Sequence, residues 1–112
     1  MDKLTRINLF YDFYGAMLTE RQRRFIDLYY CHDLSLGEIS EQFGVSRQSV
    51  HDTLKRSEES LYKFEEKLGL VEKFLEQRDQ LDRALSYLKS GQDDDIEKAK
   101  QILTDLIQAE ES

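Results

Sequence analysis

Apolar and aromatic residues recur at helical spacing along almost the whole chain, and glycines and capping residues divide this pattern into segments. The first segment, residues 4–17, places an aromatic-rich face with Phe10 and Tyr14 on one side of a helix. The chain has no proline, and no segment alternates polar and apolar residues over the length of a strand. The sequence therefore predicts an all-α fold, in which these aromatic side chains pack in a core.

Residues with the chemistry of helix N-caps mark the expected helix starts. They are Thr19 with Gln22, Ser35 with Glu38, Ser46, and Asp94 with Glu97. Gly44 permits a tight turn after one helix, and Gly69 ends another. The expected helices cover residues 4–17, 20–31, 36–43, 47–68, 70–89 and 95–110.

The chain is long enough for one domain with an extension. Residues 1–69 are expected to form a helix-turn-helix domain. Residues 70–112 are expected to form a C-terminal helical hairpin that serves oligomerisation or partner binding. The sequence leaves open whether this hairpin packs on its own domain or on a second chain.

Membrane insertion is not expected. The apolar runs are far shorter than the ~18 residues needed to span a bilayer. The N-terminus lacks the apolar stretch and the cleavage site of a signal peptide. A single cysteine cannot form an internal disulfide, so the sequence points to the cytoplasm.

Residues 35–60, SLGEISEQFGVSRQSVHDTLKRSEES, have the layout of a helix-turn-helix. In this motif the first helix braces the second, which enters the major groove of DNA. Ile39, Phe43 and Val50 supply the apolar contact between the two helices, and Gly44 lies in the turn. The expected core is three-helical, like that of winged-helix and homeodomain proteins.

The candidate nucleic-acid-binding residues follow this turn directly. They are Ser46, Arg47, Gln48, Ser49, His51, Asp52, Lys55 and Arg56. Arg47 can pair bidentately with guanine, Gln48 can pair with adenine, and Asp52 can accept from cytosine. The two serines suit a phosphate or a base edge, and Arg56 suits a phosphate. The alternative is a helical corner used only for packing, because a charged face is often merely solvated.

Net charge argues against strong non-specific binding to DNA. The formal net charge is −7, and affinity for DNA comes largely from Lys and Arg. The acidic excess is uneven, however: residues 1–69 contain 10 Lys/Arg and 12 Asp/Glu, and residues 70–112 contain 6 and 11. Residues 46–57 carry Arg47, Lys55 and Arg56 against Asp52, a local balance of +2. Glu58 and Glu59 then limit any contact to about three helical turns.

Several segments together resemble a known family. Residues 43–50, FGVSRQSV, resemble the DNA-reading helix-turn-helix of sigma factor region four. Residues 8–15 (NLFYDFYG), 18–24 (LTERQRR), 33–39 (DLSLGEI) and 46–56 (SRQSVHDTLKR) are similar to the YlxM family, small bacterial helix-turn-helix proteins of the signal recognition particle operon. The resemblance implies a regulatory protein of transcription that binds nucleic acid and is linked to the signal recognition particle pathway.

Two functions are consistent with these observations. The first is a DNA-binding regulator that contacts double-stranded DNA through residues 46–57 and forms a homodimer through the hairpin. The second is an adaptor that does not bind DNA and whose acidic hairpin contacts the particle's GTPase or its RNA.

The sequence contains no pattern for a metal, cofactor or catalytic site. Cys31 beside His32 lacks the further ligands that zinc requires. Asp93, Asp94 and Asp95 lack the ligand spacing of a calcium loop. There is no Gly-rich phosphate loop and no nucleophile with a base at a recognisable spacing. We therefore expect a protein that is not an enzyme and needs no cofactor.

Overall fold

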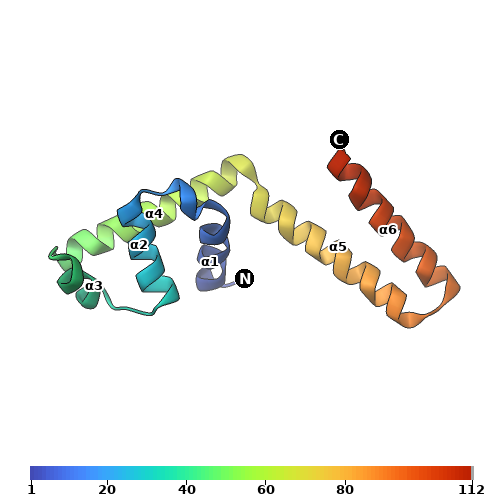
Figure 1. Cartoon of the computed structure of the whole chain (residues 1–112), viewed down its shortest axis with the longest axis horizontal. Coiled ribbons are helices and arrows are strands. Elements are labelled where there is room, and N and C mark those ends of the chain that lie inside the picture. Colours follow the sequence, from blue (N-terminus) through green and yellow to red (C-terminus); the bar gives the residue numbers. More distant parts are fainter. Residues whose placement is uncertain (112) are drawn as a thin grey trace. The chain divides into compact units, whose positions relative to one another are not determined.

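A computed structural model of the chain describes residues 1–111 (Figure 1). Its α-helices are α1 Lys3–Tyr14, α2 Glu20–Ile26, α3 Leu36–Phe43, α4 Arg47–Leu68, α5 Leu70–Ser90 and α6 Asp93–Glu111. A 3-10 turn, Gly15–Met17, follows α1, and a π-helical segment, Asp27–Cys31, follows α2. The described residues contain no strand, so the predicted all-α fold is confirmed.

The chain divides into two compact units. The first unit is Met1–Val71, and the second comprises the residues from Glu72 onward. Leu70 and Val71, which the sequence assigns to the hairpin, belong to the first unit because their backbone N–H groups bind side chains of that unit. None of the described helices is long and apolar enough to cross a membrane.

The core of the first unit is built on α4. Helices α1, α2 and α3 each pack against this one long helix (Figure 1). The inner face of α4 buries Val50, Leu54 and Leu61, which are at most 5% exposed. Full burial of such a side chain contributes roughly 1.5–3 kcal/mol. The other buried members of this core are Ile7, Phe10, Tyr14, Leu18, Phe25, Ile26, Ile39 and Val71.

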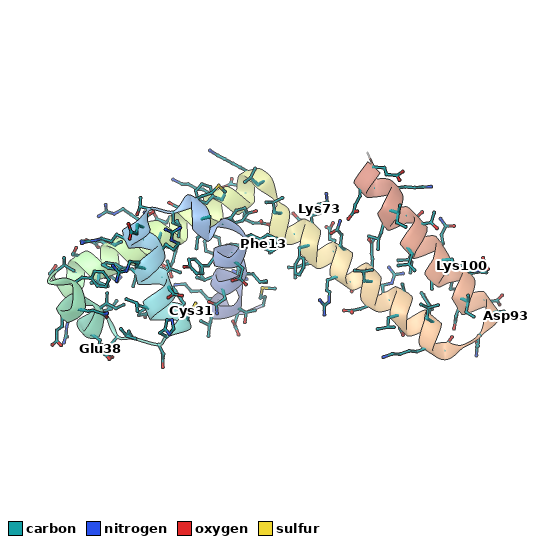
Figure 2. All side chains as sticks on the ribbon, viewed as in Figure 1. Phe13, Cys31, Glu38, Lys73, Asp93 and Lys100 are labelled. Carbon is teal, nitrogen blue, oxygen red and sulfur yellow. The ribbon has the colours of Figure 1, made fainter. Side chains whose placement is uncertain are left out.

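The aromatic face of α1 packs largely as predicted. Phe10 is 7% exposed, and its ring meets Tyr62 of α4 edge-on at a centroid distance of 5.0 Å. Tyr14 is fully buried, and the centroid of its ring lies 5.9 Å from that of Phe64 on α4. Phe13 lies at the edge of this face and remains 37% exposed (Figure 2).

A partly buried hydrogen-bond network joins the ends of α1 and α4 to the first residues of α5. The Tyr14 hydroxyl donates to the Glu65 carboxylate at 2.5 Å and accepts from the Leu70 N–H at 3.1 Å. The same Glu65 oxygen accepts from the Val71 N–H at 2.9 Å. Between the two helices Gly69 adopts a left-handed φ of 61°, which favours glycine. The network thus satisfies N–H groups that have no partner within a helix.

The expected helices differ from the structure at three places. The first, expected over residues 4–17, is α-helical only to Tyr14 and ends in the 3-10 turn. The second helix reaches Cys31 as predicted, but its last five residues are π-helical, which hydrophobic spacing alone does not reveal. The prediction that Asp94 caps the last helix is wrong, because α6 already begins at Asp93 (Figure 2). Here Ser90 organises the turn: its hydroxyl donates to Asp95 at 2.6 Å and accepts from the Gln92 N–H at 3.3 Å.

The second unit is a helical hairpin. Helix α5 and helix α6 run antiparallel and are joined by a short turn at Gly91, where φ is 70° (Figure 1). In the described part of this unit only two hydrophobic residues, Ala84 and Ala99, are buried. Large apolar side chains of the same helices remain substantially exposed, and these include Phe74, Leu75, Leu81, Leu85, Leu88, Leu103 and Ile107.

We expect Tyr14→Phe to lower the free energy of unfolding by roughly 1–3 kcal/mol, because it removes the hydroxyl that donates to Glu65 and takes away the acceptor of the Leu70 N–H. Urea denaturation at neutral pH measures this loss. Burial and the hydrogen bond to Glu65 raise the pKa of the Tyr14 hydroxyl above its ordinary value of 10.0. The contribution is therefore complete below about pH 10 and is lost as the pH rises through the folded-state pKa.

Tyr87→Phe is the matched control, since Tyr87 lies on α5 with its ring beside Lys98. It should change the free energy of unfolding by less than ~0.5 kcal/mol. Equal losses in the two variants would contradict the role of the Tyr14 network.

Candidate nucleic-acid interface

The predicted helix-turn-helix is formed by α3, a tight turn and the start of α4. Ser35 and Glu38 make a reciprocal capping box, each side chain accepting the other residue's N–H at 3.1 Å. Gly44 ends α3 with a left-handed φ of 65°. Ser46 then caps α4 by accepting the Ser49 N–H at 3.0 Å. These local bonds fix where the candidate reading helix begins.

Apolar contacts hold the two helices of the motif together. Ile39 of α3 and Val50 of α4 are fully buried. Phe43 at the end of α3 packs edge-on against Phe25 of α2, with ring centroids 4.9 Å apart. The motif therefore rests on α2 as its third helix, which agrees with the three-helical core predicted from the sequence.

The structure places the eight candidate residues around one half of α4 and not on a single narrow face. Gln48, Lys55 and Arg56 are exposed, and Asp52 is partly exposed. The two serines are less available to a ligand. The Ser46 hydroxyl already accepts a hydrogen bond as the helix cap, and Ser49 is half-buried.

Arg47 lies at the edge of this surface, where its guanidinium covers Gly37 of α3. A Cβ atom at Gly37 would come within 2.9 Å of an Arg47 nitrogen. Glycine at this position therefore lets the Arg47 side chain lie across the start of α3. Arg47 is still exposed to solvent.

Three of the candidates form a hydrogen-bonded cluster. The Gln48 amide donates to Asp52 at 2.9 Å, and the His51 ring nitrogen Nδ1 lies 3.5 Å from the same carboxylate oxygen. These hydrogen bonds, that of Gln48 first, hold the pKa of the Asp52 carboxyl below its usual value. Asp52 is thus an ionised acceptor in the middle of the exposed surface, and it orients the Gln48 amide.

The two glutamates that follow this surface differ in their surroundings. Glu58 accepts a hydrogen bond from the Tyr30 hydroxyl and pairs with Lys3 at 3.3 Å, and its side chain is only 16% exposed. Glu59 is exposed. The sequence predicts that both glutamates limit the positive surface after Arg56. In the structure Glu59 has this effect more than Glu58, because the charge of Glu58 is paired with Lys3.

Two arginines of α2 lie close to the turn. The Arg24 guanidinium covers the Phe43 ring at 4.8 Å from its centroid, and that of Arg21 lies 5.9 Å from it. Phe43 is the last residue of α3, so these cations lie beside the turn that leads into α4. In the sequence these two arginines stand in one run with Arg23. The sequence gives no sign that the aromatic ring of Phe43 holds them there.

Lys3 is a residue that the sequence reasoning missed. It lies beside Lys55 and Glu58 in one surface groove, although it is far from them in the sequence. Only the folding of α1 against α4 brings these residues together, and no local pattern could have revealed it.

The neighbourhood of Cys31 does not form a metal site. His32 pairs with Asp27 at 3.3 Å, and the Cys31 sulfur lies 3.8 Å from the Asn8 amide oxygen. Desolvation, reinforced by Asp27, raises the pKa of the Cys31 thiol. Within residues 1–111 no group of three or more His, Cys, Asp or Glu side chains could hold a metal ion.

Comparison with known proteins agrees with this architecture. Residues 1–103 match the UPF0122 family, described as "Putative helix-turn-helix protein, YlxM / p13 like". The chain is 50% identical over 112 residues to a UPF0122 protein of Desulforamulus reducens, with 96% of each chain covered. UPF0122 proteins of Bacillus cereus strain AH187 and Bacillus anthracis strain A0248 are 48% identical over 103 residues, covering 92% of this chain and 93% of theirs. The chain therefore belongs to the UPF0122 family of YlxM-like helix-turn-helix proteins.

Proposed function

We propose that this protein is a cytoplasmic, non-catalytic regulator that binds double-stranded DNA through the first turns of α4. The observation that carries the proposal is the surface at the start of this helix. Directly after an ordered turn and cap, exposed Arg47, Gln48, Lys55 and Arg56 surround the ionised Asp52. Such side chains at the start of the second helix are those with which helix-turn-helix proteins read base edges.

Local charge supports the same function. Arg21 and Arg24 add two cations beside the turn, where Glu20 lines the same surface hollow. Together with the +2 balance of residues 46–57, this gives a balance of +3 around the start of α4. A positive surface of this kind favours contact with phosphates even when the whole chain is acidic.

The cellular context of this proposal comes from the family resemblance. Proteins of the YlxM family resemble this chain in all four motif segments and belong to the signal recognition particle operon. We therefore propose that the regulation concerns the signal recognition particle pathway.

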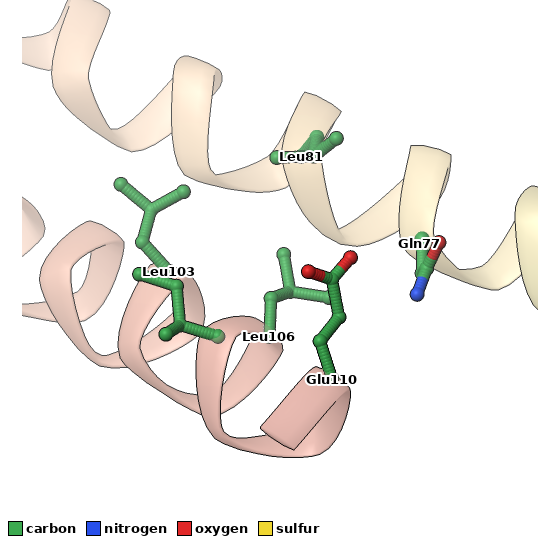
Figure 3. Close-up of a pocket in the computed structure, with 6 residues that line it drawn as sticks. Gln77, Leu81, Leu103, Leu106 and Glu110 are labelled. Atoms are coloured by element: carbon green, nitrogen blue, oxygen red, sulfur yellow. The ribbon is translucent and has the colours of Figure 1, made fainter.

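The hairpin supports self-association as part of the same function. An apolar groove of about 170 Å³ opens between its helices, with Leu81 of α5 facing Leu103 and Leu106 of α6 (Figure 3). Ile107, which also lines this groove, is 60% exposed. A hairpin that buries so little apolar surface is stabilised when a second copy completes a four-helix bundle. A dimer would also place two reading helices on two half-sites.

The acidic surface of α5 supports a second candidate function. Glu76, Asp79 and Asp82 are exposed along this helix, and Glu72 precedes them on its first turns. Such a surface suits a basic partner by electrostatic complementarity. On this alternative the chain is an adaptor that contacts the GTPase of the signal recognition particle or its RNA, and α4 makes no contact with DNA.

For the DNA-binding function we expect the double variant Arg47→Ala, Lys55→Ala to abolish retention of a duplex that the unaltered protein selects from genomic fragments. Two charge contacts are lost while the buried face of α4 is untouched, so the helical circular dichroism spectrum should not change. The matched control is Arg78→Ala with Lys89→Ala, which removes the same charge from exposed positions of α5. This control should retain the duplex.

Charge-removing variants of α4 and of α5 separate the two candidate functions. Binding through phosphates weakens steeply as salt concentration rises. Unchanged duplex retention by the α4 double variant would exclude α4 as the reader. If, in addition, neutralising Glu72, Glu76, Asp79 and Asp82 abolishes capture of the particle's GTPase or RNA, the adaptor function is supported instead.

For self-association we expect Leu85→Glu to convert a dimer into a monomer in sedimentation at micromolar concentration. Leu85 is 50% exposed on α5, and a charge there would lie unpaired within an apolar seam. Ser86→Glu adds the same charge at the adjacent exposed position and should leave the dimer intact. A monomeric mass for the unaltered protein would refute self-association.

A further inference from the structure

A polar groove runs along one flank of α4 in the first unit. It has a volume of about 320 Å³. We call it the flank groove. Its polar walls are formed by Lys3, Tyr29, Tyr30, His51, Lys55 and Glu58. Leu36 and Leu54 also line it. The groove thus joins the start of α1, the π-helical segment, the start of α3 and the candidate reading helix.

The charges in the flank groove leave it receptive to an anion. Its carboxylate, Glu58, is already bound by the Tyr30 hydroxyl and by Lys3, and is largely withdrawn from solvent. The Lys3 side chain is 66% exposed, and an ammonium group has three donors, of which Glu58 needs one. Lys55 is exposed on the same wall. Two ammonium groups therefore face one carboxylate that is already hydrogen-bonded.

The π-helical segment shapes the opposite wall. Tyr29 and Tyr30 are adjacent on this segment, with their rings edge-to-face at 5.0 Å. The bond from Tyr30 to Glu58 anchors the pair, while Tyr29 remains 36% exposed. Soon after this segment Asp33 adopts a left-handed φ of 57°, which is uncommon for a residue other than glycine. Irregular backbone of both kinds is frequent at functional sites.

The groove lies where a strand of bound DNA would pass. His51 and Lys55 are one turn apart on α4, so they form one edge of the surface that includes Gln48 and Asp52. Arg56 follows His51 by five residues and lies about 140° around the helix from it. A helix in the major groove has a phosphate backbone on each side. The flank groove would therefore face one phosphate backbone of the DNA, and Arg56 would face the other.

We propose that the flank groove binds a backbone phosphate of duplex DNA beside the reading helix, with Lys3 and Lys55 as its charged donors and the Tyr29 hydroxyl as a neutral one. This inference rests on the proposed DNA-binding function and adds a phosphate site outside the helix-turn-helix. It assigns a binding role to α1, whose first turn would otherwise serve only the fold. A phosphate contact of this kind fixes the register of the protein on the duplex without reading sequence.

The test uses Lys3→Gln in the full chain, because glutamine keeps a donor for Glu58 and removes the charge. We expect weaker binding to the duplex selected by the unaltered protein, with the slope of log affinity against log salt concentration reduced by about 1. The preference among base sequences should not change. Lys73→Gln, at an exposed lysine of α5 (Figure 2), is the matched control and should bind as the unaltered protein does.

Duplexes that carry one uncharged methylphosphonate identify the phosphate involved. For the unaltered protein, one position beside the contacted bases should weaken binding, and in Lys3→Gln the same substitution should have no further effect. An unchanged salt slope together with an unchanged methylphosphonate profile in Lys3→Gln would overturn the phosphate site and leave the proposed function standing. Failure of the unaltered protein to bind any duplex would overturn both.

Discussion

The buried face of α4 is the constraint on which the first unit depends. Helices α1, α2 and α3 each pack against α4, whose buried face contributes Val50, Leu54 and Leu61 to the shared core. Ser57 lies in the same face and is fully buried. Its hydroxyl donates to the Thr53 carbonyl at 2.6 Å, and this hydrogen bond compensates for the loss of water. Gln48, Asp52 and Lys55 lie on the other side of this helix, whereas Arg47 lies at the edge of the packed face, across Gly37 of α3. The core therefore determines which α4 residues reach solvent.

Several carboxylates of the first unit are used for the fold. Glu58 is bound by Tyr30 and Lys3, and Glu65 is bound by Tyr14 and the Val71 N–H. Of the two, Glu58 is paired with the Lys3 ammonium, which offsets the negative field that this carboxylate presents to a ligand. The formal charge of −7 thus overstates the repulsion that a phosphate would meet at the start of α4. A total charge is a weak guide to the potential at one surface.

The fold could be predicted where the signal is local. The bounds of α3 follow from the Ser35 capping box and Gly44, because each involves residues close in sequence and a backbone geometry that few residues adopt. The cap at Asp94 was mistaken because three successive aspartates offer equivalent acceptors, and the contact between Ser90 and Asp95 selects among the possible starts. The π-helical segment was missed because its apolar spacing does not differ from that of an α-helix over so few residues.

The candidate site was predictable only in part, for the same reason. The residues after Ser46 could be identified from their place behind a turn. The cover of Gly37 by Arg47, the stacking of Arg24 on Phe43 and the position of Lys3 all depend on contacts between segments that are distant in the sequence.

Separation of the two units has a physical consequence for the proposed function. A single first unit offers few cations to a duplex, and each neutralised phosphate releases about one counterion, so one unit alone would bind weakly and depend modestly on salt. In a dimer joined through the hairpins, the two copies of the first unit would release twice as many counterions. Binding of the second copy to the same duplex would then be an intramolecular step. The apolar surface of α5 and α6 would then control affinity without touching DNA, while α4 controls sequence preference. Affinity and specificity would thus reside in different units of the chain and could change independently of each other.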